Sequence, residues 1–497
     1  MNKNVAQTLK YTTIRVSFLT NKDSFWRPIM FLASLELKNF RSFEHFSIDF
    51  LEKANTPKQL AFIYGENGSG KTTIVDALSF LQMSIKTITD YYAIMSLFNS
   101  TNPLTLFAQQ NNNKEINELK QLIAKVRPVE AEPEEMTSLD FAFFLNDKKY
   151  VYSLTLSASE VVEESLSYPV AKNFAKAFSI SRKNGVFSFE KHSALFLDSE
   201  EKEKICVALP KSFGKNTFLS FVLNELKNSP NREMDKAFDP GLVAFLNGIQ
   251  KIRILAKAEE QDPSDPNFFQ VSFDHDETRI NSNPLFLANP LAGSDVDDKV
   301  FQEQKKNTAH SLSVFFRAIS SSFRGVCYRN TLLGQNKTPI YLLYFQKNSH
   351  GKMVEVPYYR ESTGHLQLVR IFFSLVSASA GDLVVADEVD EGIHDLLFVA
   401  LIKELVSEGS AFKGQLIATT HNFLAMNNNL PKSSIYILDI PEGGKDPLAK
   451  SVDQYSDVRI QAHNNIEKQY SQGVFGGVPY PGIFSFSETI NDLKGGK

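Results

Sequence analysis

The sequence has little cysteine, no long apolar run and no large excess of charge of either sign. Its two cysteines, Cys206 and Cys327, lie far apart, which argues against a disulfide framework or a zinc site and fits a reducing compartment. The first residues lack the apolar core of a signal peptide, and no apolar run is long enough to span a bilayer. The net charge of −4 argues against a protein coated in positive charge, although a local basic groove stays compatible with it. We therefore expect a cytoplasmic protein without a membrane partner, and nucleic-acid binding stays open.

The most informative motif that is present is AFIYGENGSGKTTIVDAL at residues 61–78. It places GxxxxGK[ST] after an apolar strand and before a helical pattern, which is the context that a P-loop requires. Its glycines let backbone N–H groups approach phosphate oxygens, Lys71 is suited to reach the β- and γ-phosphates, and Thr72 offers a hydroxyl to Mg²⁺. The predicted ATP-binding residues of this loop are Asn67, Gly68, Ser69, Gly70, Lys71, Thr72 and Thr73.

The patterns along the chain predict two kinds of sheet. Residues 30–50 alternate apolar and polar positions as two half-buried strands do, and a hairpin is predicted about Asn146 and Asp147, so an antiparallel sheet is expected. From 336 onward, strands alternate with helices as in an α/β core. We divide the chain into 1–29, an N-terminal extension; 30–190, a lobe with the P-loop and the antiparallel sheet; 191–335, a helical lobe with a polar, mobile insertion over 257–310; and 336–497, the completion of the core with a C-terminal tail.

Two further strand ends carry polar side chains. In GDLVVADEVDEGIHD, an apolar strand ends at Asp387, a candidate Mg²⁺ ligand, and Glu388, a candidate base for the attacking water. In QLIATTHN, another apolar strand ends at His421, which is placed to hydrogen-bond a terminal phosphate. Taken alone, the first motif could be a strand end that runs into a charged loop, and His421 could be a structural strand-end residue. Because parallel strands deliver their carboxyl ends to one edge of a sheet, we expect Asp387, Glu388 and His421 to lie together beside the P-loop.

The segment ESTGHLQ at 361–367 precedes a long helical pattern. Ser362 and Gly364 either cap their own helix or bind a phosphate from outside. The order of the motifs along the chain favours the second role.

The order of P-loop, SxG signature, DE strand end and histidine resembles the ABC-type ATPase heads of RecF, SMC proteins and the overcoming-lysogenization-defect nucleases. The opening LELKNFRSFEHFSIDF is similar to their first hairpin, with Arg41 and Ser42 at the turn that faces the nucleotide in that group. More closely, ESTG, DEVDEGIHD, QLIATTHN and the tail NNIEKQYSQGVFGGVPY resemble the stand-alone AAA-type ATPases of bacterial abortive-infection and anti-phage operons. The signature lacks the second glycine of transporter domains, and Gln82 lies too near the P-loop for the usual Q-loop.

The resemblance implies an α/β fold, a P-loop ABC-type head with a mixed sheet, an antiparallel β lobe and a helical lobe. It also implies ATP and Mg²⁺ as cofactors, a homodimer or higher oligomer in which each signature contacts the partner's ATP, and a separately encoded effector such as a Toprim-like nuclease. The main alternative is a RecF- or SMC-like DNA-maintenance ATPase that clamps DNA. A transporter subunit is disfavoured, because the P-loop and Asp387 lie far apart in the sequence.

Overall fold

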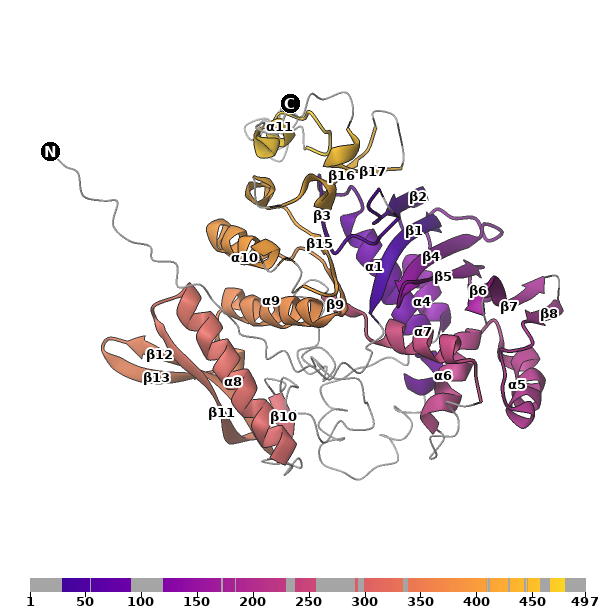
Figure 1. The fold of residues 1–497 in the computed structure, drawn as a ribbon, viewed down its shortest axis with the longest axis horizontal. Coiled ribbons are helices and arrows are strands. Elements are labelled where there is room, and N and C mark those ends of the chain that lie inside the picture. The colour runs from indigo at the N-terminus through magenta and orange to yellow at the C-terminus, as the bar shows by residue number, and fades with distance from the viewer. Residues whose placement is uncertain are drawn as a thin grey trace, which may run out of the picture.

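The computed structural model covers most of the chain in three sheets and the helices that pack on them (Figure 1). The described residues are 29–53, 55–90, 119–170, 173–183, 185–228, 237–255, 291–293, 299–333, 338–407, 409, 412–427, 430–441, 444, 446–455 and 465–478. The predicted N-terminal extension, apart from residue 29, and most of the predicted insertion lie outside these residues.

A six-stranded sheet forms the centre of the molecule. Its strands, in spatial order, are β17 (Leu448–Ser451), β16 (Ile435–Asp439), β3 (Leu60–Gly65), β15 (Gln415–Thr419), β14 (Leu383–Ala386) and β9 (Arg253–Leu255). All neighbouring pairs are parallel except β16 with β17. Strands β14 and β15 are buried at every position, as expected of parallel strands covered on both faces. The carboxyl ends of β3, β14 and β15 therefore meet at one edge, as the sequence predicts.

A seven-stranded antiparallel sheet forms the second layer. Its strands, in spatial order, are β2 (Phe43–Asp49), β1 (Met30–Phe40), β4 (Thr137–Leu145), β5 (Lys148–Leu156), β6 (Val161–Val170), β7 (Asn173–Lys183) and β8 (Val186–Lys191). The predicted hairpin about Asn146 and Asp147 is confirmed, since both have positive φ, 49° and 60°, as in the turns that suit β-hairpins. Arg41 and Ser42 join β1 to β2.

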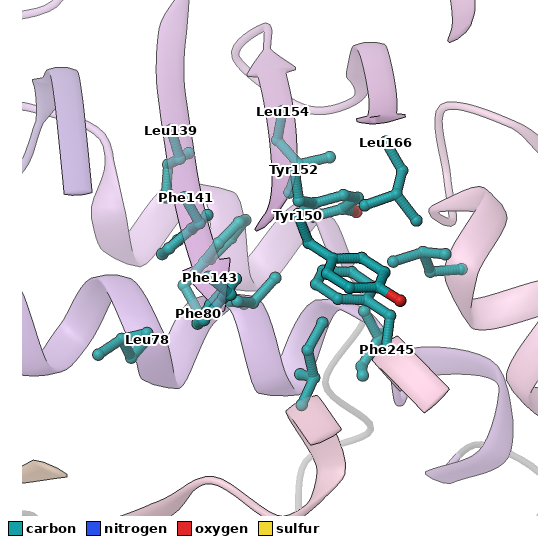
Figure 2. Close-up of a cluster of buried hydrophobic side chains, with 14 of the residues drawn as sticks. Leu78, Phe80, Leu139, Phe141, Phe143, Tyr150, Tyr152, Leu154, Leu166 and Phe245 are labelled. Carbon is teal, nitrogen blue, oxygen red and sulfur yellow. The ribbon is translucent and has the colours of Figure 1, made fainter. Parts of the chain in front are cut away.

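The antiparallel sheet shares one hydrophobic cluster with five helices. These are α1 (Lys71–Ser84), α4 (Leu119–Val126), α5 (Ser199–Ser212), α6 (Phe218–Asn228) and α7 (Pro240–Gln250). Figure 2 shows its aromatic centre, where the Phe245 ring of α7 lies against rings from β4 and β5. Phe245 stacks on Tyr150 at 5.4 Å between centroids, and it meets the edge of Phe143 at 5.9 Å. The P-loop helix is thus anchored in the largest apolar core of the described structure.

A third sheet, together with α8 (Lys299–Ile319), forms a lobe at the end of the molecule away from β8 (Figure 1). Its strands are β10 (Leu291–Gly293), β12 (Thr338–Ser349), β11 (Phe323–Leu333) and β13 (Lys352–Pro357). Two expectations are corrected here. The strand after residue 336 does not join the central sheet, because β12 pairs with β11 across the expected domain boundary. Residues 299–310, expected within a mobile insertion, open α8, whose apolar face packs on this sheet.

The opposite face of the central sheet carries α9 (Thr363–Ala380) and α10 (Asp395–Ser407), which contribute to a second hydrophobic cluster. The short helix α11 (Ile466–Ser471) follows near the ends of β3 and β16. Among the described helices, none combines the length and the apolar character needed to cross a bilayer.

One buried carboxylate gives the fold a pH dependence. Glu164 on β6 is fully buried and accepts hydrogen bonds from Phe218 N at 2.5 Å, Leu219 N at 3.1 Å and Tyr152 Oη at 3.0 Å. It therefore caps the start of α6. Burial nevertheless outweighs these bonds and raises the pKa of Glu164 to about 7.

We therefore expect the unfolding free energy to fall as pH rises through the window between the ordinary pKa of a glutamate and about 7. In this window the folded chain holds a proton that the unfolded chain has released, and the loss amounts to about 3 kcal/mol. Urea unfolding of the wild type and of Glu164→Gln from pH 4.5 to 8 measures it. Equal slopes for the two proteins would contradict the assignment.

Candidate active site

Most of the predicted site residues gather around one open cleft of about 1460 Å³ at the carboxyl edge of the central sheet. The β1–β2 turn, the P-loop and the segment after α4 form its walls. Of the predicted residues, it is lined by Arg41, Ser42, Asn67, Gly68, Gly70, Lys71, Thr72, Thr73, Glu388 and His421.

The P-loop follows the last residue of β3 and turns into α1 through two glycines with positive φ, 84° at Gly68 and 89° at Gly70. A Cβ at Gly70 would lie 2.2 Å from the ring of Phe43, so only glycine fits between α1 and the first hairpin. Lys71 is buried, and its Nζ donates to the carbonyl oxygens of Gly65 at 2.8 Å and Glu66 at 2.9 Å. The P-loop thus holds the Lys71 ammonium near the N-terminal end of α1.

The loop fits a phosphate group because the glycine turn at Gly68 and Gly70, together with Lys71 and Thr72, lines the cleft. The Oγ of Ser69 is buried and makes no hydrogen bond within the part of the chain that the structure describes, but it lies toward Gly65 and Ser69 does not line the cleft. The start of α1 adds the positive end of a helix dipole.

Asp387 lies beside the predicted Mg²⁺-binding hydroxyl. Its Oδ2 accepts from Thr72 Oγ1 at 2.9 Å, and its Oδ1 accepts from Thr419 Oγ1 at 2.5 Å. Asp387 is buried, and its backbone N donates to Leu255 O at 2.7 Å. A hydroxyl and a carboxylate at this spacing are the two protein ligands that P-loop proteins offer to Mg²⁺ beside phosphate oxygens. No group of three or more His, Cys, Asp or Glu residues among the described positions could hold a metal by itself.

Glu388 and His421 lie next to each other at the edge of the cleft, at the ends of the neighbouring strands β14 and β15. Glu388 Oε1 lies 3.7 Å from His421 Nε2, and both side chains are partly exposed. Glu388 has φ of 45°, a left-handed backbone that is unfavourable for glutamate, and its N–H donates to Thr419 Oγ1 at 2.7 Å. The backbone N–H of His421 donates to the carboxylate of Asp390 at 3.3 Å. The turn that carries the carboxylate is therefore fixed to the strand end that carries the histidine.

At the first hairpin, Arg41 has φ of 52° and its Nε lies 3.0 Å from Asp76 Oδ2 on α1. Its backbone N–H donates to Val126 O at 2.6 Å, which ties the hairpin turn to the end of α4. The predicted nucleotide-facing turn is thus attached to the P-loop helix.

Ser362 and Gly364 are not among the residues that line this cleft. Ser362 caps α9 by accepting from His365 N, so the capping alternative is present in the structure. The expected phosphate-binding role of Ser362 stays a prediction. A Cβ at Gly364 would lie 2.6 Å from Gly392 O, in the loop that follows Glu388. The neighbouring Glu361 is bound by Lys347 Nζ of β12 at 2.5 Å. The segment around Ser362 therefore connects the third sheet to the loop that follows Glu388 in its own chain.

Several contacts around the site residues were not predicted from the sequence. Thr419 bonds both Asp387 and the backbone of Glu388, and Asn422 Nδ2 donates to Asp395 Oδ1 at 3.1 Å beside His421. Polar residues flanking a strand-end histidine are the signal that could have found them. Gln82 donates to the carbonyls of Ile249, Gln250 and Ile252, so it holds the end of α7 rather than facing the cleft.

Comparison with known proteins places this geometry in a family. The family model described as "AAA domain, putative AbiEii toxin, Type IV TA system" matches residues 60–427. A 55-residue stretch is 38% identical to the DNA replication and repair protein RecF of Bacillus mycoides (strain KBAB4), and covers 11% of this chain and 13% of that protein. The chain thus matches only a small part of that relative's length.

Two solved structures show distant similarity. The SMC head bound to the C-winged helix domain of ScpA has a TM-score of 0.40 at 15% identity, covering 86% of this chain and 100% of that chain. The SMC head domain from Thermotoga maritima has a TM-score of 0.33 at 15% identity, covering 85% and 99%. The family match contains the P-loop, the signature, the DE strand end and the histidine, and this chain belongs to the AbiEii-type family of AAA ATPase domains.

Proposed function

We propose that this protein binds and hydrolyses ATP at the edge of the central sheet, and that two copies must meet to complete the site. The observation that carries this is the gathering of Lys71, Thr72, Glu388 and His421 at one cleft, with Asp387 buried behind it and bonded to Thr72. Ser362 and Gly364 do not line this cleft. A phosphate-binding signature outside its own cleft is typical of a site shared between two chains.

The residues divide the chemistry among them. Lys71 and the P-loop amides bind the β- and γ-phosphates, and Arg41 with Ser42 faces the nucleotide from the hairpin. Thr72 and Asp387 would hold Mg²⁺, which neutralises charge that develops on the phosphate oxygens. Glu388 orients and deprotonates the attacking water, and His421, 3.7 Å from its carboxylate, contacts the terminal phosphate. In a head-to-tail pair, Ser362 and Gly364 of each chain would close on the ATP of the other.

The cellular role that we propose is control of a separately encoded effector, such as a nuclease, in bacterial defence against phage. The description of the matched family, which names a toxin and a type IV toxin–antitoxin system, supports this class of role. ATP-dependent pairing would set two states of the protein that an effector can distinguish. The protein would act in the cytoplasm.

We test the shared site by mixing two inactive variants. Ser362→Arg places a bulky side chain at an exposed position, so it should bind ATP yet hydrolyse it about 10²-fold more slowly than the wild type. Mixed with Lys71→Ala, it should regain up to half the activity in each mixed dimer, because one composite site is intact. ATPase rates measured against the mixing ratio give the answer.

Ser362→Ala is the matched control, because it removes the helix cap without adding bulk and should cost about 1 kcal/mol of stability. Gly364→Arg is a poorer variant, since any Cβ there meets Gly392 O of the same chain. A full-rate Ser362→Arg homodimer would exclude the shared site. Lack of rescue despite proven subunit exchange would favour hydrolysis within one chain or obligatory coupling of both sites.

A second candidate is a clamp on DNA, favoured by the 55-residue match to RecF. Such a protein would lose DNA affinity steeply as salt rises, because phosphate contacts release counterions. Affinity for a duplex measured at increasing salt, with and without ATP, decides this. A flat, weak response would reject the clamp and leave the defence role.

A further inference from the structure

The C-terminal segment 465–478, which we call the tail strap, has no role in the function proposed so far. It comprises α11 and the glycine-rich turn that follows it. Asn465 caps α11 by accepting from Lys468 N at 3.0 Å. The strap buries Ile466, Tyr470 and Phe475 in the second hydrophobic cluster, beside the residues of β3 and β16.

At one end, the strap is bonded to the strand beside the P-loop. Gly477 N donates to Asp439 Oδ1 at the end of β16 at 2.8 Å. Gly476 and Gly477 have φ of 72° and 66°, and a Cβ on Gly476 would lie 2.3 Å from the Asp439 carboxylate. Only glycines permit this close approach.

Beside this bond, the strap also lies next to Gly65, whose carbonyl oxygen accepts from Lys71. A Cβ position on Gly477 lies 3.5 Å from Gly65 Cα, and Leu438 pairs with Gly65 in the parallel register. Gly65 itself is confined, since a Cβ there would be 2.8 Å from Leu438 O. Its carbonyl is one of the two that hold Lys71 Nζ. The strap thus packs directly on the residue that positions the ammonium.

At its other end, the strap contacts the turn that follows His421. Glu467 accepts from Asn427 Nδ2, and the ring of Tyr470 lies 6.5 Å from that of Phe423. Phe423 N donates to His421 O at 3.0 Å. Tyr470 also lies 6.1 Å from Tyr64 of β3, and its hydroxyl donates to Gly477 O at 2.9 Å. One short element, anchored by a few buried side chains, therefore touches both the P-loop strand and the histidine turn.

We infer that the tail strap positions the γ-phosphate side of the site, with Asp439 as the positioning residue that fixes the strap to the P-loop strand. This inference rests on the proposed ATPase function. None of the bonds named above joins the strap to the glycine turn of the P-loop or to the Thr72–Asp387 pair. Loosening the strap should shift Lys71 and His421 without removing the Lys71 charge, so we expect it to disturb hydrolysis, which depends on exact placement, more than binding.

The test compares three full-length variants. Asp439→Ala removes the acceptor of Gly477 N, and Asp439→Asn keeps an oxygen at that place. Lys468→Ala changes an exposed side chain on α11 of the strap. We expect Asp439→Ala to lower kcat for ATP about 10- to 100-fold with KM changed much less, because small misplacements of reacting groups cost that much. Asp439→Asn should restore most of kcat, and Lys468→Ala should match the wild type.

Hydrogen exchange without nucleotide provides a readout that does not depend on hydrolysis. In Asp439→Ala, amides of 65–71 and of 421–427 should exchange faster, together with the strap. Faster exchange confined to 465–478 with an unchanged kcat would overturn the inference. If the wild type hydrolyses no ATP, the proposed function fails, and the exchange pattern alone decides on the strap. If Asp439→Ala does not fold, Glu467→Ala loosens the other end, and unchanged exchange at 421–427 would then overturn it.

Discussion

Lys71→Ala is expected to weaken ATP binding by about 100-fold or more. The side chain is buried, and its ammonium is held 2.8 Å from Gly65 O and 2.9 Å from Glu66 O, where the β- and γ-phosphates would arrive. A hydrogen-bonded charge at a partly desolvated site contributes about 3 kcal/mol, since water competes poorly there. Titration of ATP by calorimetry measures the change.

Lys71→Met serves as a matched control, because it keeps most of the apolar stem and removes only the charge. Both variants should lose affinity to a similar degree while their unfolding curves stay close to that of the wild type. Unchanged ATP affinity in a folded Lys71→Ala protein would refute the assignment of this loop as the phosphate site.

Glu388→Gln should keep ATP binding and slow hydrolysis by about 10²-fold or more. Glutamine preserves the shape of the side chain and its place beside His421, but it cannot accept the proton of the attacking water. Single-turnover hydrolysis measures the chemical step. Because ATP then persists, the dimer should accumulate, which light scattering detects.

Glu391→Gln is the matched control for this variant, since Glu391 is an exposed carboxylate in the same turn. It should hydrolyse ATP at close to the wild-type rate. A Glu388→Gln protein that stays monomeric with ATP bound would show that ATP does not pair two copies, and the head-to-tail mechanism would then be wrong. Hydrolysis at the wild-type rate would instead mean that another group activates the water.

The parts of the site that follow from local sequence were predictable. The P-loop, the apolar strands ending at Asp387 and at His421, and the Asn146–Asp147 turn each depend on neighbouring residues. The parallel order of the strands then places the motifs at one edge, because their carboxyl ends coincide.

What the sequence could not predict depends on contacts between distant residues. Thr419 bonds Asp387, 32 positions away, and its own segment shows only that a polar residue stands near the strand-end histidine, not which residue it contacts. Strand β12 resembles a core strand in its apolar pattern, but it pairs with β11 in a separate sheet. Helix α8 begins within a polar segment, and its apolar face becomes evident only once the third sheet packs on it.

The contact between Gly364 and Gly392 has a consequence for the way in which two copies would work together. Since a Cβ on Gly364 would lie 2.6 Å from Gly392 O, the start of α9 cannot shift far without displacing the loop after Glu388. In a head-to-tail pair, the ATP that one chain holds would press on the signature of the other, and thereby on that chain's water-activating glutamate. Hydrolysis should then be cooperative, with a sigmoidal dependence on ATP concentration that flattens when the loop is loosened.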